Sequence, residues 1–207
     1  DDLGISSDPE KQSVGAGFIA ESRINKGLLY FGTDKGAFWV SKNDGGEWTE
    51  NSTGLPNNYI RSIFPSQFKA SRVYTAMSGL NYDDLGNHLY MSEDYGKNWQ
   101  SITSNLPDEI ANVIIEDPKN ENILYAGMYR GVYISTNRGQ SWSLLGKDMP
   151  NVSVADLEIN VKSMDLVVAT HGRGLYKVNL NPIHEMMSNN QLNSVKLFNT
   201  EKFVRPR

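Results

Sequence analysis

The stretch SEDYGKNW at residues 92–99 decides the fold of this 207-residue chain, because its pattern S-x-D-x-G-x-x-W occurs three times. The other two copies, with Asn in place of Asp, cover residues 41–48 and 135–142. Their tryptophans, Trp48, Trp99 and Trp142, are 51 and 43 residues apart. This period is typical of proteins in which each repeat is one four-stranded unit that stacks on its neighbours to bury its faces.

Each position of the octapeptide has a structural task. The serine ends a strand, and the Asp or Asn side chain can bond the backbone of a tight turn. Glycine at the fifth position supplies a positive φ without steric cost, and the tryptophan starts the return strand with a large ring to bury. We therefore predict structural roles for Ser41, Asn43, Gly45, Trp48, Ser92, Asp94, Gly96, Trp99, Ser135, Asn137, Gly139 and Trp142.

A cation site is the alternative role for the Asp and Asn side chains of the motif. The calcium-loop pattern D-x-[DN]-x-[DN]-G is not met by any of the three copies. Phosphate-loop, zinc and dinucleotide signatures are also missing from the sequence. We expect no metal site and no cofactor.

The residues around each motif repeat as well. Three short runs rich in aromatic and β-branched residues precede it and predict strands joined by turns. A Leu-Pro or Met-Pro pair follows it and marks the passage to the next repeat, because Pro cannot extend a central strand. The runs lie at residues 17–21, 27–32 and 36–40, at 59–64, 72–77 and 88–91, and at 112–116, 122–127 and 131–134.

The predicted fold class is all-β, with three full four-stranded β-propeller blades and a partial fourth. The fourth unit offers three strands but no fourth motif, and the sequence does not reveal which segment supplies the missing strand. A short helix is expected around residues 184–189. We expect an N-terminal segment at 1–13, blades at 14–57, 58–108, 109–151 and 152–180, and a C-terminal connector at 181–207.

The three motifs resemble the Asp-box, or BNR, repeat of β-propellers such as sialidases, xyloglucan-degrading enzymes and sortilin-like ectodomains. The resemblance covers roughly residues 14–207. The order of features is similar to the C-terminal part of a propeller in larger sortilin-like or glycosyl-hydrolase-like proteins. The resemblance implies that upstream blades, or another copy, cover exposed blade edges.

Composition is that of a water-exposed β domain. Hydrophobic residues make up 39% and aromatic residues 10% of the chain, and the mean hydropathy of −0.48 excludes a membrane span. The net charge of −4 gives no electrostatic basis for binding nucleic acid. Cysteine is absent, which excludes disulfides and thiolate sites but fits any compartment. The resemblance to exported propellers implies a secreted, periplasmic or cell-surface bacterial protein.

The first candidate ligand-contact segment is the insertion at residues 79–86, which is longer than the matching turns of the other repeats. It carries Tyr82, Asp83 and Asp84, and long loops on rigid scaffolds are where binding groups concentrate. His88, just after it, is a further candidate. A solvated loop without a ligand is the alternative interpretation.

The second candidate segment is residues 170–174, where glycines alternate with other residues. His171 and Arg173 can together meet an anionic group, although hairpin geometry alone explains the glycines. Arg130, in the turn before the last strand pair of the third repeat, completes the candidate contact residues.

Catalytic residues cannot be assigned. A sialidase needs clustered arginines and a Tyr nucleophile, and none of the arginines stands in the Arg-Ile-Pro setting of sialidases. A glycosidase needs two carboxyls roughly 5 to 9.5 Å apart across a cleft, and the most suggestive acidic pair is the adjacent Asp83 and Asp84. We therefore predict a non-catalytic propeller module that binds a protein, peptide or glycan through blade-face loops. The alternative is part of a sialidase-like or xyloglucanase-like glycoside hydrolase.

Overall fold

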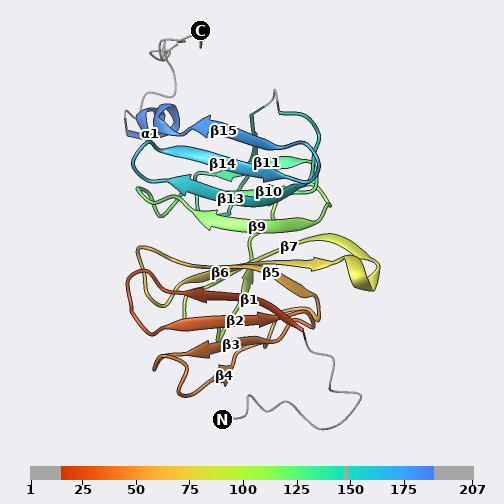
Figure 1. Ribbon diagram of the computed structural model, residues 1–207, viewed down its shortest axis with the longest axis vertical. Coiled ribbons are helices and arrows are strands. Elements are labelled where there is room, and N and C mark those ends of the chain that lie inside the picture. The colour runs from red at the N-terminus through yellow and green to blue at the C-terminus, as the bar shows by residue number, and fades with distance from the viewer. Residues whose placement is uncertain (1–14, 147–148, 189–207) are drawn as a thin grey trace.

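A computed structural model describes residues 15–146 and 149–188 of the chain. Its strands form four antiparallel sheets, which we call blades 1 to 4 in chain order. Figure 1 shows the blades following one another along the long axis, with blade 1 at the bottom and blade 4 at the top. Three blades have four strands and the last has three. This confirms the predicted all-β fold of three full blades and a partial fourth.

Within each blade, the strands follow one another in chain order. Blade 1 contains β1 (Ala16–Glu21), β2 (Leu29–Thr33), β3 (Phe38–Ser41) and β4 (Thr49–Glu50). Blade 2 contains β5 (Tyr59–Pro65), β6 (Val73–Gly79), β7 (Asp84–Ser92) and β8 (Gln100–Ser101). Blade 3 contains β9 (Ala111–Glu116), β10 (Leu124–Met128), β11 (Gly131–Ser135) and β12 (Ser143–Leu145). Blade 4 contains β13 (Val154–Asn160), β14 (Asp165–Thr170) and β15 (Leu175–Asn179), and the helix α1 (Asn181–Ser188) follows it.

The first strand of every blade faces one central pocket. Residues of β1, β5, β9 and β13 line this pocket, which has a volume of about 460 Å³. Burial is greatest in the inner strands of the middle blades: every residue of β6, β9 and β10 is buried. The outermost strands β4 and β8 have two exposed residues each. In blade 2, burial therefore falls from the second strand to the outermost strand.

Three apolar cores fill the junctions between neighbouring blades. Successive side chains of a strand point to opposite faces of its sheet, so a middle blade contributes to two junctions. In blade 3, Ile114 and Leu124 pack toward blade 2, whereas Val113 and Tyr125 pack toward blade 4. The cores lie between the blades, and each blade is stabilised by its neighbours.

The loop within residues 79–86 is shorter than the sequence predicts. β6 continues to Gly79, one 3₁₀ turn covers Leu80–Tyr82, and β7 already begins at Asp84. Asp83 has a left-handed φ of 55°, which reverses the chain and places Asp84 opposite Gly79 in the strand register. Most of the insertion therefore lengthens a β-hairpin, and His88 is a strand residue.

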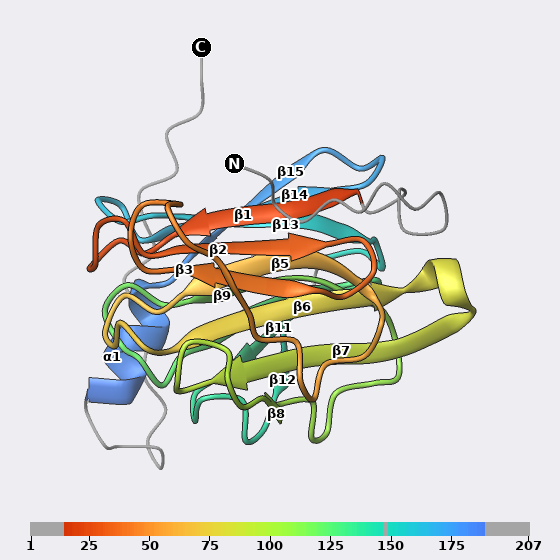
Figure 2. The same cartoon turned by 90° about the horizontal axis from the view of Figure 1, so that it is seen from below.

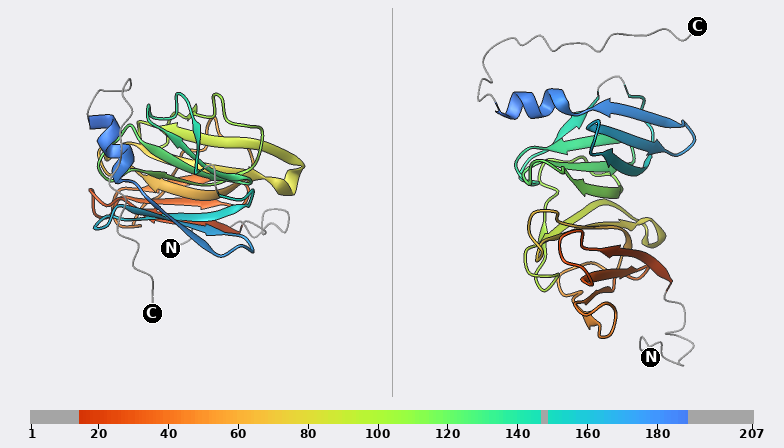
Figure 3. Two further views of the ribbon diagram at one scale, coloured as in Figure 1. Left: turned by 90° about the horizontal axis from the view of Figure 1, so that it is seen from above. Right: turned by 60° about the vertical axis from the view of Figure 1, so that its left-hand side comes forward.

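The helix α1 starts earlier than the expected range of 184–189. Pro182 lies in its first turn, where the missing N–H of proline costs no helical hydrogen bond. The carbonyl of Leu180 accepts the first bond, from the backbone N–H of Ile183 at 3.1 Å. Figures 2 and 3 show α1 on the side of the molecule opposite the β6–β7 hairpin. Neither α1 nor any other helix within residues 15–146 and 149–188 is long and apolar enough to cross a membrane.

The three Asp boxes fold alike. In the second box, Ser92 Oγ donates to Asp94 Oδ1 and accepts from the backbone N–H of Gly96, both at 2.8 Å. Asp94 Oδ1 also accepts from the backbone N–H of Asn98 at 2.9 Å, and the same bonds recur in the other two boxes. Gly96 has φ of 86°, a conformation that disfavours a side chain. The polar residues of the motif thus brace the turn itself.

Two of the box tryptophans join a blade to the one before it. Trp99 donates its indole N–H to the carbonyl of Asn51 in blade 1 at 3.0 Å, and its ring lies edge-on to Phe38 at 4.8 Å between centroids. Trp142 donates in the same way to the carbonyl of Ile102 in blade 2 at 2.7 Å. Trp48 instead contacts Phe31 of its own blade. The Asp box therefore links neighbouring blades as well as forming a turn.

Candidate binding face

The antiparallel order of the strands gives the molecule two faces. The β2–β3, β6–β7, β10–β11 and β14–β15 turns lie on one face, which we call the hairpin face. The Asp boxes and the turns between the first and second strands of each blade lie on the other, the Asp-box face. The candidate contact residues Tyr82, Asp83, Asp84, Arg130, His171 and Arg173 all belong to turns or strand ends of the hairpin face.

The β6–β7 hairpin projects furthest from the hairpin face, as the yellow ribbon in Figure 2 shows. Its tip exposes three large apolar side chains, with Leu80 56%, Tyr82 51% and Leu85 59% accessible. Asp83, at the turn itself, is also exposed. Exposed apolar side chains gathered at one projecting tip are typical of a contact surface.

Asp84 and His88 form a bonded pair at the base of this tip. Asp84 Oδ2 lies 2.6 Å from His88 Nε2 and accepts a bond from Asn58 Nδ2 at 2.9 Å. Its Oδ1 accepts from the backbone N–H of Gly86 at 3.0 Å. The bond from Asn58, then that from Gly86, hold the pKa of Asp84 below its ordinary value. Both oxygens of this carboxylate are thus engaged in fixing the hairpin.

The hairpin is also tied to the link between blades 2 and 3. Asn87 donates from its side chain to the carbonyl of Pro107 at 2.7 Å and of Leu106 at 3.3 Å. His88, whose side chain is 17% exposed, stacks on Tyr90 with 6.5 Å between ring centroids. These contacts hold the exposed tip on a rigid base.

Glu109 is a functional candidate that sequence reasoning missed. It is 7% exposed in the link before β9, where Arg130 and Tyr133 interact with its carboxylate. Burial raises the pKa of Glu109, and Arg130, whose Nε lies 3.5 Å from Oε2, opposes this shift. The sequence offers one weak signal, a charged residue directly before the apolar run that opens at Ile110.

We expect Glu109→Gln to raise the free energy of unfolding at pH 7 by on the order of 1 kcal/mol, because it removes a buried charge without changing shape. The folded pKa lies above the unfolded one, so Glu109 favours folding at low pH. This favourable contribution is lost as the pH rises through the folded pKa. Urea unfolding between pH 4 and pH 8 should give the variant and the parent equal free energies of unfolding at pH 4. A variant less stable than the parent at pH 8 contradicts the interpretation.

The candidate segment at 170–174 is a tight turn between β14 and β15. The carbonyl of Gly174 accepts from Thr170 Oγ1 at 2.6 Å and from the Thr170 backbone N–H at 3.1 Å. The backbone N–H of His171 donates to the carbonyl of Ser153 at 2.8 Å. Both His171 and Arg173 have exposed side chains. The turn is fixed by backbone bonds, which leaves the imidazole and guanidinium groups facing solvent.

The central pocket carries charge of both signs. Arg61 on β5 and Asp156 on β13 line it, and Arg23 of blade 1 lies 3.9 Å from Glu158 of blade 4. Across residues 15–146 and 149–188, no cluster of three or more His, Asp or Glu side chains is arranged to hold a metal ion. The pocket therefore offers polar contacts but no built metal centre.

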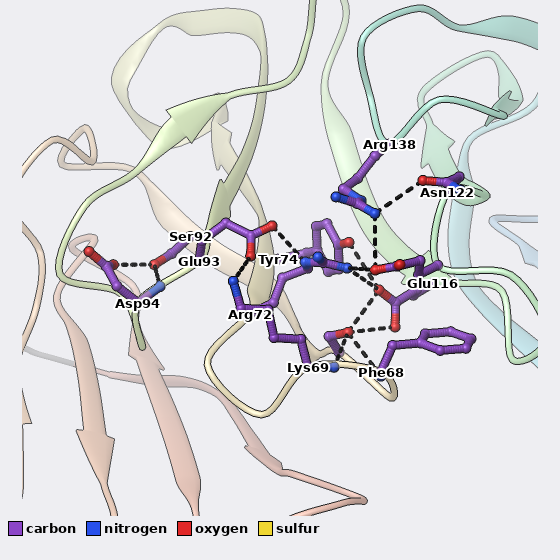
Figure 4. Close-up of polar contacts among 12 residues, drawn as sticks. Phe68, Lys69, Arg72, Tyr74, Ser92, Glu93, Asp94, Glu116, Asn122 and Arg138 are labelled. Carbon is purple, nitrogen blue, oxygen red and sulfur yellow. Dashed lines mark hydrogen bonds and ion pairs between the residues drawn. The ribbon is translucent and has the colours of Figure 1, made fainter.

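A buried ion network lies on the Asp-box face between blades 2 and 3 (Figure 4). Arg72, only 4% exposed, donates to Glu93 and to Glu121, both at 2.7 Å. Its Nη1 lies 3.7 Å from Glu116, which is 1% exposed and also accepts from Tyr74 OH at 3.0 Å. Burial raises the pKa of Glu116, opposed by its hydrogen bonds and Arg72. This network joins the two blades: the Glu116 carboxylate is buried, whereas the Glu93 and Glu121 side chains are 37% and 41% exposed and are held by Arg72.

The profile of the Sortilin-Vps10 family, described as sortilin, neurotensin receptor 3, matches residues 36–205. The chain belongs to the Sortilin-Vps10 family. No curated protein matches it significantly.

Solved structures share the blades of this Sortilin-Vps10 chain. A GH74 enzyme from Niastella koreensis superposes with a TM-score of 0.66 and 17% identity over 81% of this chain and 29% of the enzyme. The GH74 xyloglucanase from Xanthomonas campestris gives 0.64 and 14% over 81% and 30%. YCF48 bound to D1 peptide gives 0.60 and 13% over 81% and 52%. The chain thus spans less than a third of the GH74 structures and about half of YCF48, and at these identities the likeness shows the fold.

Within this Sortilin-Vps10 chain, the predicted contact residues separate into two kinds. Asp84 and His88 bind each other and are partly buried, whereas Arg130 is 70% exposed and lies 3.5 Å from Glu109. Tyr82, Asp83, His171 and Arg173 are exposed. The second kind, together with Leu80 and Leu85, forms the part of the hairpin face that is open to a ligand.

Proposed function

We propose that this Sortilin-Vps10 chain is a non-catalytic interaction module that binds a protein, peptide or glycan through the hairpin face. The observation that carries the proposal is the exposed tip formed by Leu80, Tyr82 and Leu85 on a firmly bonded base. A polypeptide ligand is favoured over a glycan, because two of the three exposed side chains are aliphatic. Tyr129 and Leu175, 54% and 72% exposed in neighbouring hairpins, extend the same apolar character.

The matched family and one structural neighbour support a polypeptide ligand. The family description names neurotensin receptor 3. The structure of YCF48 that shares this fold contains a bound D1 peptide. Both names associate the matched protein with a peptide ligand. The GH74 neighbours show that the same fold also carries glycoside hydrolysis, so fold alone does not decide the function.

The carboxyls of the hairpin face argue against hydrolysis. Asp84 and Glu109 have pKa values shifted in opposite directions, as acid–base pairs do. Each shift has a structural cause, however: the pKa of Asp84 is lowered because hydrogen bonds engage both of its oxygens, and the pKa of Glu109 is raised because the carboxyl is buried. Neither group offers a free carboxylate toward a cleft on this face, so hydrolysis is the less favoured function.

The test is a binding screen followed by matched surface variants. A displayed random-peptide library and a glycan array serve as probes of the 207-residue chain. We expect peptides enriched in apolar residues, and we expect the triple variant Leu80→Ser, Tyr82→Ser, Leu85→Ser to weaken their binding at least tenfold. Titration calorimetry measures the change.

The Asp-box face provides the control for this test. Ile24, Phe68 and Val161 are 48%, 43% and 53% exposed there, and replacing all three with serine should leave peptide binding unchanged. Loss of binding in this control, with retention in the hairpin triple variant, moves the site to the other face. Turnover of xyloglucan by the parent chain overturns the non-catalytic proposal.

We also propose that another Asp-box blade, upstream in the parent protein or in another copy, covers the open side of blade 1. Leu29, Phe31 and Trp39 are only half-buried there. The first box has an intermediate glycine, Gly45, whereas the corresponding glycines of the other boxes are buried against the preceding blade. A bacterial export route remains our expectation for the parent protein.

A further inference from the structure

A second pocket lies on the Asp-box face, at the outer part of the junction between blades 2 and 3. Its volume of about 360 Å³ falls within the range of roughly 300–1,000 Å³ for small-molecule sites. One wall is the third Asp box, at residues 136–140, and the opposite wall is β8 with Ile102 after it. We call it the amide pocket, and it lies on the opposite face of the molecule from the hairpin tip.

The amide pocket combines apolar residues with exposed polar ones. Its apolar lining residues Met91 and Ile102 are 9% and 4% exposed. Its exposed polar lining residues are Gln100, Ser101, Asn122, Thr136 and Gln140. The side chains of Gln100, Thr136 and Gln140 bond to no other residue within 15–146 and 149–188. Each amide offers two donors and an acceptor, and the hydroxyl offers both functions, so several hydrogen-bonding groups are available to a ligand.

Arg138 fixes one wall of the pocket. Its backbone, with a left-handed φ of 56°, donates its N–H to the carbonyl of Asn122 at 2.8 Å. Its Nη2 donates to Asn122 Oδ1 at 3.1 Å (Figure 4) and lies 3.0 Å from Glu121 Oε2. The guanidinium charge is therefore already matched by a carboxylate. A wall that is held in place and carries no unmatched charge favours a neutral ligand.

The matching groove between blades 1 and 2 is crossed by side chains. Asn51 donates from Nδ2 to the carbonyl of Tyr95 at 2.9 Å, and the Lys42 ammonium lies 3.8 Å from the centre of the Tyr95 ring. In the junction between blades 2 and 3, Ile102 stands at the position of Asn51 and Arg138 at that of Tyr95. Isoleucine has no donor with which to bridge the groove. The amide pocket thus arises from residues particular to this junction.

We propose that the amide pocket binds one or two sugar units of a neutral glycan. A sugar ring has apolar C–H faces, which can lie against Met91 and Ile102. The hydroxyls at its edge match the free amides of Gln100 and Gln140 and the hydroxyl of Thr136. An extended peptide is less suited, because β8 offers an edge of only two residues for backbone pairing. This site goes beyond the polypeptide binding proposed for the hairpin face and does not depend on it.

Nuclear magnetic resonance of the isotope-labelled 207-residue chain tests the proposal. The neutral probes are cellobiose, maltose and diacetylchitobiose, and glucuronic acid is the anionic probe. We expect at least one neutral probe to cause saturable shifts of the side-chain amide signals of Gln100, Asn122 and Gln140. The affinity should not change with salt concentration, because salt screens interactions between charges and the ligand has none.

Matched variants locate the site. The double variant Gln100→Ala, Gln140→Ala should bind the saccharide at least tenfold more weakly than the parent. The control is Thr49→Ala, Lys97→Ala, which changes the exposed residues at the same two repeat positions of the groove between blades 1 and 2. We expect the control to bind as the parent does. Equal thermal unfolding of the three proteins shows that the changes leave the fold intact.

The other outcomes overturn the proposal. No saturable shift with any neutral probe at millimolar concentration excludes the site, as do shifts confined to the hairpin face. Tighter binding of glucuronic acid contradicts the assignment of a neutral ligand. If peptides from the display library shift these amide signals and the saccharides do not, the pocket is a peptide site instead. The hairpin-face triple variant should bind saccharide normally, so failure of this proposal and failure of the proposed function are distinguishable.

Discussion

Replacing Trp142 with alanine is expected to lower the free energy of unfolding by about 3–5 kcal/mol, the range for a buried tryptophan. Trp142 is 4% exposed, belongs to the core between blades 2 and 3, and donates its indole N–H to the carbonyl of Ile102. The substitution removes the ring from that core and leaves a buried carbonyl without its donor. Urea unfolding followed by circular dichroism measures the loss.

Trp48 is the matched control, because it occupies the same position of the first Asp box. Its ring is half-buried and contacts Phe31 of its own blade. We expect Trp48→Ala to cost about 1 kcal/mol, as for a partly exposed side chain. An equal loss of unfolding free energy in the two variants would contradict the view that the box tryptophan stabilises the contact between blades.

Replacing Arg72 with leucine is expected to cost about 3–5 kcal/mol at pH 7, because it leaves the buried Glu116 carboxylate without its cationic partner. Arg72 serves Glu93, Glu116 and Glu121 together. Lys69→Met is the control, since Lys69 is exposed and pairs with Glu93 at the surface. We expect it to cost under about 1 kcal/mol, as exposed ion pairs do.

The loss caused by Arg72→Leu should depend on pH. Burial already raises the pKa of Glu116, and Arg72 opposes this shift, so its removal raises that pKa further. A carboxyl with a raised folded pKa favours folding at low pH and loses that contribution as the pH rises. The variant should therefore lie closer to the parent at pH 5 than at pH 8 in the same urea titration. A difference that is constant across this range argues that Arg72 acts through packing alone.

The repeats of the sequence predicted the blades because turn chemistry and strand propensity are local properties. The Asp boxes and the strands could be predicted from Ser, Asx, Gly and aromatic residues at fixed spacings along the sequence. The reach of Trp99 to Asn51 and of Trp142 to Ile102 was not predictable, because it joins residues 48 and 40 positions apart. Spacing within one motif carries no information about such partners.

The candidate site was predictable only in part. The exposed residues Tyr82 and Asp83 stood out because they interrupt a repeat. Asp84 also stood out, but its pairing with Asn58 depends on the strand register and the blade stacking. Glu109 escaped notice because burial of a lone carboxyl leaves almost no trace in sequence.

The contacts of Trp99 and Trp142 make the array of blades directional, because each tryptophan bonds to the blade before its own. Blades 2 and 3 each bond through the box tryptophan to the preceding blade, and blades 1 and 2 provide the accepting carbonyls, so the two sides of a blade are chemically different. Duplication of one whole repeat adds a tryptophan and an accepting carbonyl together and leaves both existing ends unchanged. Such a chain can lengthen in evolution by whole units, whereas loss of half a repeat disrupts a joint on each side.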